Sequence, residues 1–200
     1  SIKNTAKLGK SEWSVLEADE SDGSFVHIAP TYSIITNIDR EHMDFYKSIE
    51  DLKRYFIEFI NKIPSFGKSF ICIDDKINNE LIKKIKNKNF YTYGLRSNSN
   101  FRIKNIKRFK SFSEFDIRVS LPNKEILNIK NIKIPLLGIH NITNSVGALG
   151  VALSVGIPIQ KIKRGLKNFQ GVQRRFNKIF TYNGIDFYDD YAHHPTEIKF

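Results

Sequence analysis

The sequence has very little cysteine, methionine or tryptophan, with one residue of each in 200. Because Cys72 is the only cysteine, no intramolecular disulfide can form, and a reducing cytoplasm is the expected compartment. No apolar run reaches the roughly 20 residues that cross a bilayer, and no stretch has the layout of a signal peptide. No glycine-rich phosphate loop occurs, so a bound nucleotide would need its main phosphate cradle outside this chain.

The net charge of +11 raises the possibility of a nucleic-acid-binding module. However, the acidic residues concentrate in the first quarter of the chain, and the lysines are scattered among Ile and Asn. No run interleaves basic and aromatic residues into a stacking platform. We therefore expect neither a nucleic-acid nor a membrane partner, and the oligomeric state stays open.

The length suits one domain, or one domain plus a piece of another, and 40% hydrophobic residues can supply a core. The chain begins at Ser1 and its single methionine is Met43. We therefore expect a fragment or an excised domain.

Hydrophobic patterning predicts alternating strands and helices over the first 95 residues. Strands are expected at 13–18, 32–38, 68–74 and 90–95, with helices after Ser48 and over 75–87. Ser48 is a favourable helix cap, and the apolar residues that follow it recur at helical spacing. Alternation of this kind predicts a mostly parallel sheet with flanking helices, an α/β fold.

The pattern changes near residue 100. Short alternating runs between Phe101 and Leu137 predict a small antiparallel meander. A helix should open at 138–143, and its Gly147 and Gly150 indicate close backbone packing, because glycine is a poor helix former. Pro158 should start another helix, and Asn183-Gly184 is a strong signal for a type I′ hairpin turn.

Clustered carboxylates and histidines follow the predicted strands. Four acids lie between Glu17 and Asp22, and His42 lies among Asp39, Glu41 and Asp44. Such a cluster either binds Mg²⁺ at the carboxyl edge of a parallel sheet or forms a solvated acidic loop. Likewise, Arg174-Arg175 could clamp phosphate or be surface charge, and His193-His194 could orient a substrate or cap a helix.

Five stretches occur together and in order. They are Glu17 to Asp22, Thr36 to Asp44, Gly138 to Asn141, Arg174 to Phe176, and Asp189 to Glu197. Taken together they resemble the Mur ligase family, and the wording Glu-Ala-Asp-Glu-Ser-Asp favours the member that adds L-alanine. The resemblance implies a central ATPase domain over 1–172 that lacks its phosphate loop. The start of a C-terminal Rossmann-like domain over 173–200 would follow it.

The resemblance also implies an activity, ATP-dependent amide formation between UDP-N-acetylmuramate and L-alanine through an acyl phosphate, in peptidoglycan synthesis. Other Mur-type ligases, for muropeptide tripeptide recycling or folylpolyglutamate synthesis, are the alternatives. The fragment alone should be inactive. By the same resemblance, Glu17 and His42 hold Mg²⁺, and His193 and His194 lie near the substrates. Either Asn141 or Asn144 contacts adenine, Arg175 approaches the ATP phosphates, and Asp190 holds the ribose.

Overall fold

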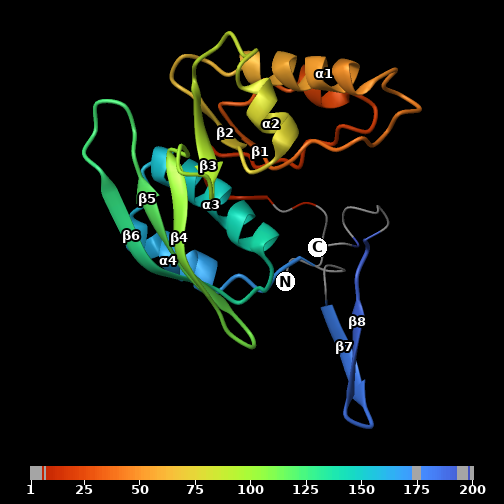
Figure 1. Cartoon of the computed structure of the whole chain (residues 1–200), viewed down its shortest axis with the longest axis vertical. Helices are drawn as coiled ribbons and strands as arrows, with labels where there is room; N and C mark the ends of the chain where they lie inside the picture. The colour runs from red at the N-terminus through yellow and green to blue at the C-terminus, as the bar shows by residue number, and fades with distance from the viewer. Residues whose placement is uncertain (1–5, 7, 173–176, 193–197, 199–200) are drawn as a thin grey trace.

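The computed structural model describes residue 6, residues 8–172, residues 177–192 and residue 198. These residues form a six-stranded sheet flanked by helices and a separate two-stranded hairpin (Figure 1). The strands of the large sheet are β1 Tyr32–Ile35, β2 Lys68–Cys72, β3 Phe90–Gly94, β4 Phe101–Arg108, β5 Ser113–Val119 and β6 Leu127–Ile134. The helices are the 3-10 helix η1 Ser24–His27, α1 Ile49–Asn61, α2 Lys76–Leu81, α3 Ile139–Ser154 and α4 Ile159–Lys167.

The strands of the large sheet lie in sequence order from β1 to β6. β1 to β4 are parallel to one another, whereas β4, β5 and β6 are antiparallel. The predicted α/β fold and the antiparallel meander are confirmed. The meander is not a separate sheet, because β4 pairs with β3 at Tyr93 with Phe101 and at Gly94 with Arg102.

Helices cover the two faces of the sheet, with α1 and α2 on one face and α3 and α4 on the other (Figure 1). The Ser48 hydroxyl accepts the Asp51 N–H at 3.1 Å, which confirms the predicted cap of α1. Leu52 and Ile60 of α1 are buried against the sheet. No helix in the described part of the chain is long and apolar enough to cross a membrane.

The close approach predicted for the glycines of α3 is confirmed. A Cβ on Gly147 would lie 2.8 Å from Cγ2 of Ile34, and one on Gly150 would lie 2.4 Å from Cε1 of Phe70. Gly147 thus meets the second half of β1, and Gly150, one turn later, meets the middle of β2. Because Ile34 and Phe70 are register partners, α3 crosses from β1 to β2 as it runs from Gly147 to Gly150.

Two predicted elements differ in the structure. The expected strand at 13–18 is an exposed extended segment with no ladder among the described residues, and Val15 is 95% exposed. An apolar run becomes a strand only when a neighbour supplies hydrogen bonds, and in the described part of the chain β2 is the one strand that pairs with β1. The expected helix at 75–87 ends at Leu81, because the chain tightens into bonds from Lys83 N–H to Glu80 O and from Lys84 N–H to Leu81 O.

The second sheet is the hairpin of β7 Asn177–Tyr182 and β8 Ile185–Asp189. Asn183 and Gly184 have φ values of 49° and 78°, so the predicted I′ turn is confirmed. Every residue of β8 is exposed. The proposed domain boundary at 172/173 stays a prediction, because residues 173–176 lie outside the described residues.

Candidate functional site

A tight turn follows β1 at the carboxyl edge of the parallel sheet and carries His42. The His42 backbone is left-handed, with φ 54°, a conformation uncommon for a residue with a side chain. Its carbonyl accepts the N–H groups of Phe45 at 3.0 Å and Tyr46 at 2.9 Å. Strained backbone of this kind persists only when its surroundings hold it, and it is concentrated at functional sites.

Tyr46 connects this turn to the acidic segment that precedes η1. Its hydroxyl donates to the carbonyl of Glu20, which also accepts the Gly23 N–H at 3.1 Å. Tyr46 is fully buried, and burial, together with the nearby Glu20 carboxylate, raises the pKa of its hydroxyl to about 12. The tyrosine therefore remains a hydrogen-bond donor at any physiological pH and holds Glu20 beside the His42 turn.

Three side chains meet there and form the Glu20–Glu41–His42 cluster. Their potential ligand atoms all lie within 4.8 Å of one another, and all three residues are half-buried. A cavity of about 30 Å³, lined by Glu20, Asn37, Ile38, Asp39, Glu41, Leu52 and Phe56, adjoins them. Two carboxylates and an imidazole are ligands for a small divalent cation, and the carboxylate oxygens suit Mg²⁺.

The structure separates the acids that the sequence presents as one stretch. Oδ1 of Asp19 accepts the Ser21 N–H at 2.8 Å, and Oδ1 of Asp22 accepts the Ser24 N–H at 2.9 Å. These hydrogen bonds with Ser21 and Ser24 lower the pKa values of both carboxyls. Both acids therefore stabilise turns, while Glu20 joins His42. Glu17 is exposed and lies outside the cluster.

The buried side-chain amide of Asn78 links two segments of chain at the carboxyl edge of the sheet. Nδ2 of Asn78 donates to the carbonyl of Thr36 at 3.2 Å and to that of Cys72 at 3.0 Å, joining the chain after β1 to the end of β2. Asp75 caps α2 by accepting the Asn78 N–H at 2.7 Å, and burial raises the pKa of its carboxyl. Sequence reasoning missed Glu20, Tyr46 and Asn78 as site residues; the only available signal was the composition of the acidic stretch.

The other predicted site residues lie elsewhere in the chain. Asn141 and Asn144 are in the first two turns of α3. The Asn141 amide donates to the carbonyl of Leu137 at 2.7 Å, whereas Asn144 is exposed. Asp190 follows β8, and its carboxylate accepts the Ala192 N–H at 2.7 Å. The predicted residues Arg174, Arg175, His193 and His194 lie outside the described residues.

Comparisons with known proteins give a consistent result. Residues 2–152 match the Mur ligase middle domain. The chain is 67% identical to a UDP-N-acetylmuramate--L-alanine ligase of Pelagibacter ubique over 99% of its own length and 43% of that protein. It is 44% identical to the protein of the same name from Brachyspira hyodysenteriae, over 94% of this chain and 40% of that one.

Among solved structures, the MurC ligase of Thermotoga maritima superposes with a TM-score of 0.70 at 25% identity, over 91% of this chain and 39% of that one. The MurF ligase of Acinetobacter baumannii gives a TM-score of 0.71 at 22% identity, over 88% of this chain and 37% of that one, and shows the shared fold. The chain spans less than half the length of the curated relatives it matches.

Proposed function

The chain belongs to the Mur ligase family, and from that premise we propose that it is the middle part of an ATP-dependent ligase that joins L-alanine to UDP-N-acetylmuramate. The observation that carries this proposal is the 67% identity to a protein of that name over nearly the whole chain. Tripeptide-recycling and folylpolyglutamate-type ligases share the fold at 23% and 16% identity, which favours neither as the activity.

The proposed reaction has two steps. The γ-phosphoryl group of ATP moves to the muramyl carboxylate, which releases ADP and forms an acyl phosphate. The amine of L-alanine then attacks the acyl carbon, the phosphate leaves and an amide bond forms. Bound Mg²⁺ would offset negative charge on the transferring phosphoryl group.

Within this chain we assign cation binding to Glu17 and His42. The cluster of Glu20, Glu41 and His42 supports the assignment of His42, because it gathers oxygen and nitrogen donors at the carboxyl edge of the parallel strands. The left-handed turn and the Tyr46 hydrogen bond keep these donors in place before any cation binds. Glu17 lies three residues before Glu20. Its carboxylate would reach the same sheet edge if residues 13–18 were held against the sheet.

The remaining assignments concern the nucleotide and the domain junction. Asn141 or Asn144 would contact adenine, and the exposed amide of Asn144 has no hydrogen bond to other described residues, which leaves it open to a ligand. Arg175 would approach the ATP phosphates and Asp190 the ribose. His193 and His194 would lie near the substrates. The complete ligase would be a cytoplasmic protein.

The test uses the complete ligase that would contain this chain. Glu17→Gln and His42→Asn should each lower kcat by at least about a hundredfold, since lost stabilisation of phosphoryl transfer costs several kcal/mol. Glu12→Gln removes the same charge from an exposed position five residues before Glu17 and should keep wild-type turnover. UDP-N-acetylmuramate-dependent ADP release is measured across a Mg²⁺ series, with thermal melting on the same preparations.

Wild-type turnover in Glu17→Gln and His42→Asn would overturn the metal assignment. Amide formation with another amino acid in place of L-alanine would overturn the activity. The isolated 200-residue chain should show no UDP-N-acetylmuramate-dependent ATP hydrolysis, because it holds no phosphate loop.

A further inference from the structure

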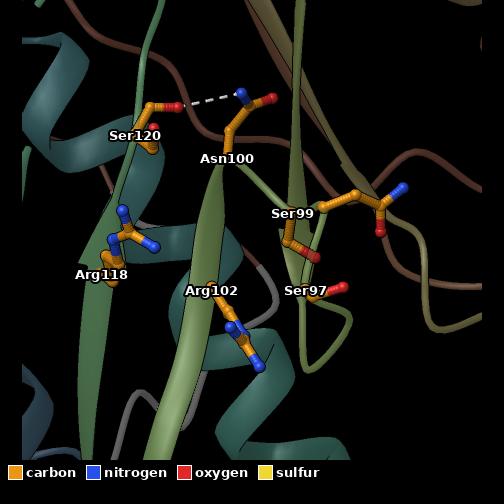
Figure 2. Close-up of a pocket in the computed structure, with 7 residues that line it drawn as sticks. Ser97, Ser99, Asn100, Arg102, Arg118 and Ser120 are labelled. Carbon is orange, nitrogen blue, oxygen red and sulfur yellow. Dashed lines mark hydrogen bonds between the residues drawn. The ribbon is translucent and has the colours of Figure 1, made fainter.

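A second cavity, of about 190 Å³, lies where β3 passes into β4. It is lined by Ser97, Asn98, Ser99, Asn100, Arg102, Arg118 and Ser120. Figure 2 shows Arg102 and Arg118 on the neighbouring strands β4 and β5, with Ser97 and Ser99 on the loop before β4. No carboxylate is among its lining residues, and none of the five stretches that indicated the ligase activity contributes to it.

Arg102 and Arg118 form no salt bridge with a carboxylate of the described residues. Arg102 and Arg118 are directly opposite each other in the antiparallel pair of β4 and β5, an arrangement in which like charges repel. The acids nearby on β5 serve other partners. Asp116 accepts from Asn105 at 2.7 Å and from the Asn131 N–H at 2.8 Å, and Glu114 pairs with lysines.

Two buried polar atoms in the cavity also lack partners. Ser99 is 5% exposed, and neither its hydroxyl nor Nε of Arg102 hydrogen-bonds to any group in the described part of the chain. Leaving a buried polar group unpaired costs roughly 1–3 kcal/mol, so such groups usually have a partner. An anion would supply an acceptor to these donors and would offset the charge of the two arginines that line the cavity.

Hydrogen bonds between neighbouring residues fix the backbone around the cavity. The Asn100 side chain accepts the Thr92 N–H at 2.9 Å and donates to the carbonyl of Ser120 at 3.1 Å. The Ser99 N–H donates to the carbonyl of Arg96 at 3.1 Å. These bonds connect β3, the loop and the residue after β5, so the backbone that carries Ser99, Arg102 and Arg118 is fixed around the cavity.

We infer that this cavity binds a phosphoryl oxyanion, as free phosphate or as a phosphate ester. A loop and two neighbouring strands supply the guanidinium and hydroxyl donors that line the cavity, and such donors bind the oxygens of a phosphoryl group. The site is distinct from the Glu20–Glu41–His42 cluster, and it stands whether or not the proposed ligase activity is correct.

The test titrates inorganic phosphate into the 200-residue chain at constant ionic strength, with chloride as the replaced anion, and follows binding by calorimetry. Phosphate should bind saturably to the wild type. Arg102→Gln and Arg118→Gln should each weaken it at least tenfold, and Ser99→Ala should weaken it severalfold. Arg108→Gln is the matched control, because it removes an equal charge from an exposed position at the far end of β4 and should change affinity less than twofold.

A melting series gives an independent readout. In chloride alone, Arg102→Gln and Arg118→Gln should melt at or above the wild-type temperature, because each relieves repulsion between facing cations. Added phosphate should raise the wild-type melting temperature and leave both variants unmoved. Titration with glycerol 3-phosphate, an ester without adenine or ribose, separates the two sources: affinity equal to that of phosphate indicates the free anion, and tenfold tighter binding that is lost in Arg102→Gln indicates an ester. Absence of saturable phosphate binding, or equal loss in Arg108→Gln, would overturn the inference.

Discussion

Two helical glycines of this protein should respond in opposite directions to the same substitution. Alanine is favoured over glycine inside a helix by up to about 1 kcal/mol, chiefly because glycine loses more backbone freedom on folding. Gly165 lies in α4, and a Cβ there would meet nothing within 4 Å. Gly165→Ala should therefore stabilise the fold by about 0.5–1 kcal/mol.

Gly150→Ala should destabilise it instead. The new Cβ would lie 2.4 Å from Cε1 and 2.5 Å from Cδ1 of Phe70, closer than carbon atoms can approach. Phe70 cannot move aside easily, because it is fully buried and its ring packs against Phe101 with centroids 5.5 Å apart. Overpacking a core costs about 1–3 kcal/mol, which exceeds the gain in helix propensity. After the helix-propensity gain is subtracted, the expected net loss is up to about 2 kcal/mol.

Urea unfolding of the two variants and the wild type, followed by the far-ultraviolet signal, measures both changes on one scale. The unfolding midpoint should fall for Gly150→Ala and rise for Gly165→Ala, with the slope unchanged. If the two substitutions stabilised the protein alike, α3 would not lie against β2 as described, and the reasoning from steric contact would be refuted.

Three further outcomes are expected. Tyr46→Phe removes the hydroxyl that donates to the Glu20 carbonyl, so it should cost about 1 kcal/mol in urea unfolding and weaken Mn²⁺ binding at the cluster; an unchanged Mn²⁺ affinity would separate Tyr46 from the site. Burial raises the pKa of the Cys72 thiol to about 11. At pH 8 this thiol therefore forms about a hundredfold less thiolate than a cysteine of ordinary pKa. Thiol labelling should therefore be slow in the native protein and fast in urea, and rapid native labelling would show that β2 is accessible. In the complete ligase, Asp190→Ala should raise the KM for ATP with little change in kcat, because a ribose contact acts alike in ground and transition states; a fall in kcat alone would rule out that role.

Local patterns in the sequence predicted most of the fold. Interactions between residues close in the chain determine three of these features. They are the apolar face of α1 with its Ser48 cap, the alternating apolar residues of β4 to β6, and the Asn183-Gly184 turn. Periodicity and cap chemistry depend on neighbours within a few positions, so one sequence carries them. The glycines of α3 are an intermediate case: their helix position implied close packing, but only the structure identifies Phe70 as the neighbour.

The tertiary structure decided which side chains meet. Residues 13–18 have the composition of a buried strand, yet they are exposed, because strand formation depends on a partner elsewhere in space. Among the clustered acids, Glu20 reaches His42 because Tyr46, 26 residues away, bonds to its carbonyl. Arg102 and Arg118 face each other only through the register of β4 and β5. Contacts between distant residues depend on how the chain closes its loops, and composition and periodicity do not encode that geometry.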